Sequence, residues 1–309
     1  MPVFNAESFL DEAIESVLSQ TFEDFELIAC DDGSTDNSSS IPKAKADKDS
    51  RVRVLGGEHR GLTHWLNEGI RLSRGPFIAR TDADDIALPA RFQRQVDYLQ
   101  ANSNCCLVGS QAFQIDPGGW QIGRWQVPLT HAEIDSRCMR GKPGCIIRPR
   151  VMVWKSALEG VHGYQPELEL AEDYDLFMRL AETGRVANLD EFLLKYRLHE
   201  KSVTVSRSSE QYRATCKALS NAWDRRSMPG EVPPVDCGKA SPRHEDLLWH
   251  WCYSALTEKH FKTARKYARR LAAAQPGNTS SWLLLVASAL GPVAFALRNL
   301  ISFRPSRSQ

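Results

Sequence analysis

Residues 77–85 read FIARTDADD, an apolar run followed by three carboxylates within four positions. Carboxylates at this density are not buried in a protein unless a cation compensates their charge, so the cluster either lies at the surface or binds a metal. An apolar strand that delivers acids to its carboxyl end is typical of open α/β sheets, which bind their ligands at that edge. The stretch therefore predicts an α/β domain whose ligand site combines a metal ion with a diphosphate.

The residues around this stretch alternate between helical and extended patterns. The spacing of apolar residues predicts helices over 7–20, 62–72 and 89–99, and strands over 25–30, 52–55, 77–81 and 105–109. Strands that alternate with helices in this way predict an α/β fold with a mainly parallel sheet and helices on both of its faces.

The remainder of the chain is less regular and more helical. We expect a strand over 145–147 with a helix over 151–158, a helix over 172–180, a strand over 192–198, a helix over 210–223 and a helical pair over 245–274. The stretch 228–242 is rich in Pro and Gly, which indicates a linker. We therefore expect a catalytic α/β domain over residues 1–205 and an α-helical C-terminal region over 206–309.

The composition limits the class of protein. The formal net charge of the 309 residues is +1, so no global field would attract nucleic acid. The eight cysteines form no Cys-x-x-Cys pair and no zinc-binding spacing. The first residues lack the basic start and apolar core of a signal peptide, so a cytoplasmic location is the default expectation.

The C-terminal end is both basic and apolar. No acidic residue follows Glu258, whereas basic residues recur up to Arg307, and the stretch 282–297 is uncharged and contains Gly291-Pro292. This stretch is short for a membrane span. Two interpretations stay open: a buried helical hairpin, or a helix that lies peripherally on the inner face of the plasma membrane, beside acidic head groups.

Three acidic groups are candidates for chemistry. Asp82-Ala83-Asp84 has the spacing that holds a divalent cation across a nucleotide diphosphate. The sequence DDGSTD at 31–36 is either a strand-to-helix turn or a carboxylate site for a base or a ribose, and two acidic strand ends in one sheet favour the second interpretation. EDYD at 172–175 either places favourable charge at a helix N-terminus or supplies a general base for an acceptor hydroxyl.

Several segments together resemble the family 2 glycosyltransferases. In the family's order they are PVFNAE at 2–7 with SVLSQT at 16–21, DDGSTD at 31–36, TDADD at 81–85, GY at 163–164 with AEDYDL at 171–176 and Arg179, and YRLH at 196–199 with Ser202-Val203. The resemblance covers residues 1 to about 205. It implies a GT-A fold, which is Rossmann-like, with one nucleotide-sugar site and inversion of configuration at the anomeric carbon.

The resemblance also implies which residues bind the donor. Pro2, Phe4 and Glu7 would line the base pocket together with Asp32. Asp82 would face the ribose or the metal shell. The donor would be a nucleotide-diphosphate sugar, with a UDP-sugar expected.

The resemblance places the metal and the base as well. Asp84 would bind Mn²⁺ or Mg²⁺, and His199 would touch the metal or the diphosphate, although a structural hydrogen bond fits this histidine equally well. Asp173 would be the catalytic base, with Glu172 beside it. The acceptor would be a glycan or a lipid-linked sugar used in cell-surface polysaccharide synthesis, and no nucleic acid would take part.

The start of the chain departs from the family pattern. Family members have a complete apolar strand ahead of the segment that begins here at Met1-Pro2. Loss of a central strand would remove both ladder hydrogen bonds and core area. We therefore expect either that the true start lies upstream or that the protein is impaired.

Three other classes of protein share some of these features. A sugar nucleotidyltransferase has a similar acid-bearing sheet, but it needs a Gly-rich basic loop that residues 5–8, NAES, do not provide. A phosphatase of the haloacid dehalogenase type needs an aspartate at position 30, which is Cys30. The third class is a truncated, inactive nucleotide-sugar-binding module, against which the intact Asp82, Asp84 and Asp173 argue.

Overall fold

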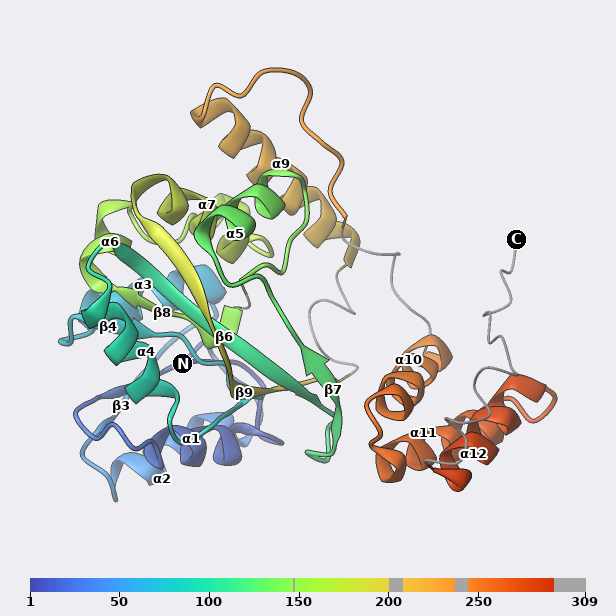
Figure 1. The fold of residues 1–309 in the computed structure, drawn as a ribbon. Helices are drawn as coiled ribbons and strands as arrows, with labels where there is room; N and C mark the ends of the chain where they lie inside the picture. The colour runs from blue at the N-terminus through green and yellow to red at the C-terminus, as the bar shows by residue number, and fades with distance from the viewer. Residues whose placement is uncertain (147, 200–207, 237–243, 292–309) are drawn as a thin grey trace. The chain divides into compact units, whose positions relative to one another are not determined.

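The structure is a computed structural model that describes residues 1–146, 148–199, 208–236 and 244–291 (Figure 1). The chain divides into two compact units: residues 1–112, 125–197 and 201–240 form the first, and residues 113–124, 198–200 and 241–309 form the second. The helix α9 (Ser208–Arg225) belongs to the first unit, whereas the expected catalytic domain ended at residue 205. Apolar residues of α9, such as Leu219 and Ala222, are part of the core of that unit.

A three-stranded parallel sheet forms the start of the first unit. Its strands are β1 (Pro2–Val3), β2 (Leu27–Asp31) and β3 (Val52–Gly56), in the order β1-β2-β3. The helices α1 (Leu10–Leu18) and α2 (Ser40–Ala46) connect these strands, and α3 (Leu62–Leu72) follows β3. Helical crossovers of this kind are what parallel neighbours require.

A second, six-stranded sheet carries the acidic stretch. Its order is β4-β8-β6-β9-β5, with β7 paired to β6. The strands are β4 (Phe77–Ala79), β5 (Ile86–Ala87), β6 (Cys105–Ile115), β7 (Gln121–Trp125), β8 (Met152–Trp154) and β9 (Arg185–Arg197). The ladders β4–β8, β6–β8 and β5–β9 are antiparallel. The predicted α/β class is confirmed. The sequence analysis predicted a mainly parallel sheet, whereas the second sheet contains antiparallel ladders.

The helices of the second sheet complete the first unit. They are α4 (Arg91–Ala101), α5 (His131–Met139), α6 (Lys155–Gly160), α7 (Glu172–Thr183) and α9. The three helices α5, α7 and α9 pack on one another (Figure 1). Successive residues of the strands β6 and β8 point to opposite faces of the sheet. Leu107 and Val153 therefore belong to the core cluster of these three helices. Their neighbours Val108 and Met152 belong to the cluster of α1 and α4 on the other face.

One sequence-based prediction in this region was wrong. A helix was expected over 151–158, with a strand over 145–147. The structure instead has strand β8 at Met152–Trp154 and a helix only from Lys155; Cys145 and Ile146 lie in a bend, and residue 147 is outside the described residues. The reason is tertiary: β8 pairs with β4 on one side and β6 on the other, and pairing on both edges outweighs a local helical pattern.

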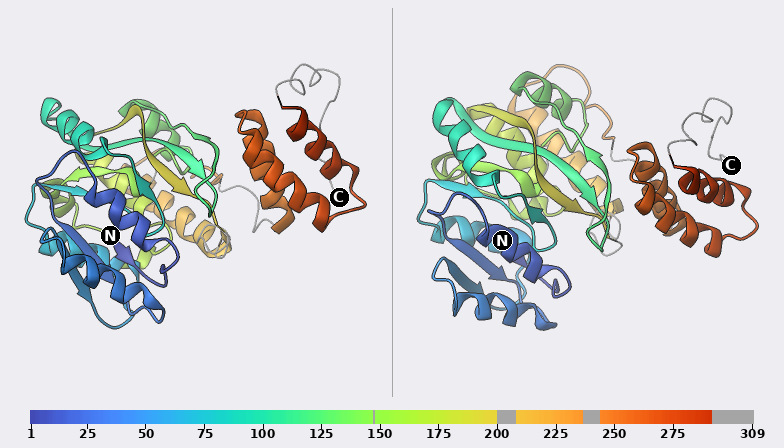
Figure 2. Two further views of the ribbon diagram at one scale, coloured as in Figure 1. Left: turned by 90° about the horizontal axis from the view of Figure 1, so that it is seen from below. Right: turned by 60° about the horizontal axis from the view of Figure 1, so that its bottom comes forward.

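The second unit consists of helices and a hairpin tip. Its helices are α10 (His244–Thr257), α11 (Phe261–Ala274) and α12 (Thr279–Leu290), which lie side by side as the orange and red helices of Figure 2. Their core contains Trp251, Tyr267, Leu271 and Leu284, together with Ile122 of the hairpin. Among the described helices, none combines the length and the apolar character needed to cross a bilayer.

A buried carboxylate holds the hairpin tip to α11. Asp116 has no exposed surface, and one of its oxygens accepts hydrogen bonds from Lys266 Nζ at 2.5 Å and from Tyr267 Oη at 2.7 Å. Its other oxygen accepts from the backbone N–H groups of Gly118 and Trp120, both at 2.9 Å. Burial alone would raise the pKa of Asp116, but the hydrogen bonds from Lys266 and Tyr267 hold it below its ordinary value.

We expect Asp116→Asn to destabilise the second unit by about 2–3 kcal/mol at neutral pH, because charged hydrogen bonds of a buried group are lost. The pKa of Asp116 is lower in the folded state than in the unfolded state. The stabilisation is therefore fully present above the unfolded-state pKa, and it disappears as the pH falls through the folded-state pKa. Urea unfolding of the wild type and of Asp116→Asn checks this. The difference between their free energies of unfolding should become smaller below about pH 4. Glu258→Gln, which removes the partly exposed partner of Arg124, serves as control and should change stability by less than about 0.5 kcal/mol. An equally small effect of Asp116→Asn would contradict the expectation.

Candidate active site

Three carboxylates converge directly after β4. Oxygen atoms of Asp82, Asp84 and Asp85 all lie within 4.8 Å of one another. Asp85 is buried, at 1% exposure, whereas Asp82 and Asp84 are partly exposed. Hard divalent cations bind to oxygen ligands, and magnesium-type sites use one or two carboxylates plus substrate phosphates. Asp82 and Asp84 are therefore the carboxylates of this cluster that a metal and a substrate could both reach.

Electrostatic repulsion within the cluster supports a metal at this place. Burial, followed by the charges of Asp84 and Asp82, raises the pKa of Asp85 well above its ordinary range. A divalent cation inverts this effect, because it favours the ionised form of nearby carboxylates. The donor set and its charge thus fit a Mn²⁺ or Mg²⁺ ion.

Buried arginines lie beneath the acidic cluster. Arg80 forms an ion pair with Asp82, and the Arg80 carbonyl accepts a hydrogen bond from Arg91 Nη2 at 2.5 Å. Arg91 and Arg150 have no exposed surface. Burial lowers the pKa of Arg91 to about 9, so its guanidinium remains charged at neutral pH. These cations partly offset the charge of the acids when no metal is bound.

A fourth arginine, at the end of β9, shapes the acidic loop itself. The backbone N–H of Arg197 donates to Asp85 Oδ1 at 2.8 Å, and its Nε donates to the carbonyl of Asp84 at 2.8 Å. Its Nη2 pairs with Glu12 at 2.5 Å, and the guanidinium lies 4.7 Å from the ring centroid of Phe9. One side chain therefore joins the acidic loop to the region around α1.

Arg197→Lys should lower the rate of the expected sugar transfer by about tenfold and the free energy of unfolding by about 1.5–3 kcal/mol, since an ammonium cannot reproduce the planar fork of hydrogen bonds. Steady-state kinetics and chemical unfolding measure the two effects. Arg94→Lys is the matched control, because Arg94 pairs with Glu191 on the surface at 2.7 Å. This substitution should change the free energy of unfolding by less than about 1 kcal/mol. Full activity in Arg197→Lys would show that the loop does not depend on this arginine.

The second acidic strand end also forms a defined site. One carboxylate oxygen of Asp32 accepts hydrogen bonds from the Arg60 N–H at 2.6 Å and from Trp65 Nε1 at 2.7 Å. The other lies 2.9 Å from His59 Nδ1, and the Gly61 N–H is 3.2 Å from both oxygens. Asp32 thus fixes the loop 59–61 beside the end of β2.

An exposed aromatic pair stands at this loop. The rings of Phe4 and His59 stack with centroids 4.6 Å apart, and the Phe4 side chain is 48% exposed. A flat, partly exposed pair beside a carboxylate can stack on a heterocyclic base. The other two residues predicted for the base pocket lie differently. Glu7 accepts hydrogen bonds from Asn37, at 3.0 Å from its N–H, and Pro2 pairs with Cys30 in the β1–β2 ladder.

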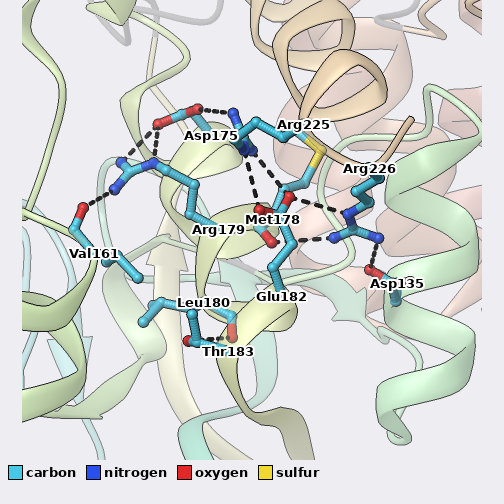
Figure 3. A network of polar contacts seen from close by, with 10 residues as sticks. All are labelled: Asp135, Val161, Asp175, Met178, Arg179, Leu180, Glu182, Thr183, Arg225 and Arg226. Carbon is cyan, nitrogen blue, oxygen red and sulfur yellow. Dashed lines mark hydrogen bonds and ion pairs between the residues drawn. The ribbon is translucent and has the colours of Figure 1, made fainter. Parts of the chain in front are cut away.

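The acids at the start of α7 divide into two groups. Asp175 is fully buried and binds Arg179 Nε at 2.7 Å, while Arg225 of α9 lies 3.7 Å away (Figure 3). It therefore serves the packing of α7 on α9. Glu172 and Asp173 lie in the first turn, with exposures of 0% and 7%. Of these two, Asp173 keeps the small exposed area through which a base can meet an acceptor.

His199 lies two residues beyond β9 and belongs to the second unit, whereas Asp84 belongs to the first. Its contact with a metal or a diphosphate therefore stays a prediction.

Sequence reasoning missed the cations and the aromatic partner of the site. His59 was not predicted, because its contacts with Phe4 and Asp32 join residues that are distant in sequence. Arg91 and Arg150 were not predicted to belong to the site, because a charged residue is ordinarily exposed. A usable signal was present for a third arginine: Arg80 stands directly between the apolar strand β4 and the acids, where its charge needs a partner.

Comparisons with known proteins agree with this geometry. The sequence profile described as "Glycosyl transferase family 2" matches residues 1–160. The chain is 33% identical over 217 residues to the putative glycosyltransferase EpsE of Bacillus subtilis, covering 69% of this chain and 76% of that protein. It is 28% identical over 231 residues to the UDP-Glc:alpha-D-GlcNAc-diphosphoundecaprenol beta-1,3-glucosyltransferase WfgD of Escherichia coli, covering 72% and 82%.

A solved structure shares the fold. The mannosyltransferase PcManGT from Pyrobaculum calidifontis, in complex with GDP-Man and Mn²⁺, superposes with a TM-score of 0.53 at 18% identity, covering 98% of this chain and 86% of that one. Fold and sequence together define a glycosyltransferase of the GT-A type. More particularly, the chain belongs to glycosyl transferase family 2.

Proposed function

We propose that the protein is an inverting, metal-dependent enzyme that transfers a sugar from a UDP-sugar to a glycan or lipid-linked acceptor in cell-surface polysaccharide synthesis. The observation that carries this proposal is the convergence of Asp82, Asp84 and Asp85 within 4.8 Å at the end of β4. The donor and acceptor named for WfgD support the substrate classes.

The donor would lie along the ends of β2 and β4. Its base stacks beside Phe4 and His59 near Asp32, and its diphosphate reaches Asp82 and Asp84, which would hold Mn²⁺ or Mg²⁺. Such an ion, when bound, neutralises the charge that develops on the departing diphosphate. Arg80 and Arg197 keep the acidic loop in place by the contacts described above.

In the reaction, the acceptor oxygen attacks the anomeric carbon from the face opposite the diphosphate. The bond between that carbon and the phosphate oxygen breaks, and UDP leaves with the electron pair. Asp173 takes the hydroxyl proton as a general base, with Glu172 beside it. A single displacement inverts the anomeric configuration and needs only one carboxylate base.

A panel of UDP-sugars and GDP-sugars with Mn²⁺ tests the proposal in two readouts. At least one UDP-sugar should raise the unfolding temperature by several degrees, and with a polyprenyl-diphosphate sugar it should yield UDP and a product of inverted configuration. Stabilisation by GDP-sugars alone would overturn the UDP assignment. Formation of pyrophosphate from a nucleoside triphosphate and a sugar phosphate would instead reveal a nucleotidyltransferase. Binding without transfer to any acceptor would favour a binding module.

We also propose that α12 contacts an anionic membrane surface. Its exposed residues Trp282, Leu283, Val286 and Leu290 are between 43% and 54% exposed, and the helix carries no charge. The preceding helix α11 exposes basic side chains, and no acidic residue follows Glu258. Apolar and basic side chains in this combination are typical of peripheral membrane helices.

Sedimentation with vesicles tests this contact. The protein should bind phosphatidylglycerol vesicles, and Val286→Ser combined with Leu290→Ser should reduce binding by at least about tenfold, since two apolar side chains no longer enter the interface. Tyr212→Ser, a change at an exposed aromatic residue of α9, is the control and should leave binding unchanged. Equal binding by wild type and the double variant would contradict the proposal.

A further inference from the structure

Asp32, at the end of β2, is enclosed by hydrogen-bond donors of the protein itself. The residue is only 5% exposed. One of its carboxylate oxygens accepts from the Arg60 N–H at 2.6 Å and from Trp65 Nε1 at 2.7 Å, and the Gly61 N–H lies 3.2 Å from both oxygens. A carboxylate oxygen has about two lone-pair sites, so these donors fill the first oxygen. A base that bound Asp32 directly would have to displace one of them.

The remaining donor to Asp32 is an exposed histidine. His59 Nδ1 lies 2.9 Å from the second carboxylate oxygen of Asp32 and 3.2 Å from its backbone carbonyl oxygen. Both of these oxygens are acceptors, so Nδ1 carries the ring proton and Nε2 is left as the acceptor of the neutral ring. The two ring nitrogens project in diverging directions, and the His59 side chain is 62% exposed. Asp32 therefore holds His59 as an acceptor that a ligand can reach.

The backbone and the ring of His59 are also held in place. Gly33 has a φ of +72°, and a Cβ atom at this glycine would lie 2.9 Å from the backbone nitrogen of His59, so the two turns are closely packed. The imidazole stacks on Phe4 with an angle of 23° between the ring planes. The acceptor is therefore oriented before a ligand binds, which lowers the entropic cost of binding.

An exposed ring with an acceptor beside it suits one edge of a nucleobase. Phe4 is 48% exposed and offers a surface on which a base can stack. Proteins read unpaired bases by such stacking together with hydrogen bonds to the Watson–Crick edge. On this edge uracil has an N3–H donor between two carbonyl groups, whereas N3 of cytosine is itself an acceptor. Uracil could donate to His59 Nε2, whereas cytosine would place two lone pairs against each other.

We propose that His59, rather than Asp32, reads the base of the donor, with Nε2 accepting the N3–H of uracil and Asp32 acting as the positioning residue that fixes the tautomer. This assignment rests on the proposed function, because it takes a UDP-sugar as the donor. It adds the residue that selects uracil over cytosine. A carboxylate fixes a histidine in the same way in the serine proteases, where asparagine in its place gives the wrong tautomer.

Isothermal titration of the intact chain with UDP and with CDP, both with Mn²⁺, tests this selection. The wild type should bind UDP about tenfold more tightly than CDP, as one hydrogen bond gained or left unmade allows. His59→Phe keeps a ring against Phe4 without an acceptor, so it should bind UDP about tenfold more weakly and no longer distinguish UDP from CDP. His250→Phe, at an exposed histidine of α10, is the matched control and should leave both affinities unchanged.

Asp32→Asn provides a readout that a structural role would not give. Its amide can keep an oxygen toward Arg60 and Trp65 and turn its NH₂ group toward His59. The proton of His59 would then move to Nε2, which becomes a donor, so the preference should shift from UDP toward CDP. If Asp32 only supported the loop, the affinities for both nucleotides would fall by the same factor.

The possible failures can be told apart. An undiminished preference for UDP in His59→Phe would overturn the assignment, and its loss in Asp32→Asn alone would give the base contact to Asp32. Equal affinity of the wild type for UDP and CDP, or an equal fall of both affinities in Asp32→Asn, would also overturn it. If the wild type bound no uridine nucleotide at all, the proposed function itself would fail, and this assignment with it.

Discussion

Asp84→Asn should reduce sugar transfer by about 10³-fold, because it removes a charged metal ligand where several kcal/mol of charge stabilisation are needed. The unfolding temperature should stay unchanged or rise slightly. The reason is that the substitution removes one of three carboxylates that repel one another within 4.8 Å. Initial-rate kinetics at saturating Mn²⁺ and a thermal unfolding curve measure the two effects.

Asp190→Asn is the matched control for this experiment. Asp190 is an exposed carboxylate on β9, so its substitution removes the same charge from the surface without touching the site. It should leave the rate within about twofold of the wild type, as surface substitutions do. Transfer by Asp84→Asn at the wild-type rate would mean that the acids after β4 do not hold the catalytic metal.

Asp173→Asn should lower kcat by roughly 10²- to 10⁴-fold while leaving donor binding intact, because general-base catalysis contributes this much. The stabilisation of the protein by UDP with Mn²⁺ should remain as large as in the wild type. This separation of binding from rate distinguishes the base from a residue that only supports the fold. Kinetics with varied donor, together with thermal unfolding with and without UDP, provide both readouts.

Asp175→Asn gives the contrasting result at the same helix. Asp175 is fully buried against Arg179, so its loss leaves an uncompensated guanidinium and should destabilise the protein by about 3–5 kcal/mol. The residual folded protein should still carry out transfer. If Asp173→Asn lost stability and donor binding together, as a structural residue would, the assignment of the base would be wrong.

The spacing of apolar residues predicted helices such as α3, whose formation depends on residues close together in the sequence. The helix over 62–72 agrees with α3 because its apolar spacing and the adjoining Gly61 are both local. Strand β8 was misassigned, since its state depends on two neighbours that are distant in sequence, β4 and β6. The antiparallel ladders of the second sheet escaped prediction for the same reason.

The acids of the site could be predicted, whereas their supporting cations could not. Asp82 and Asp84 stand together in the sequence after an apolar run, so their convergence follows from one strand. Arg197 reaches Asp84 across 113 positions, and Arg91 is buried although its residue type is ordinarily exposed. Contacts of this kind depend on the completed tertiary structure.

Binding of Mn²⁺, measured by electron paramagnetic resonance, tests the central claim most directly. The account predicts that the protein binds one equivalent of Mn²⁺, that UDP tightens this binding, and that Asp84→Asn abolishes it while Asp190→Asn does not. Failure of the wild-type protein to bind Mn²⁺ in the presence of UDP, or undiminished binding by Asp84→Asn, would contradict the account.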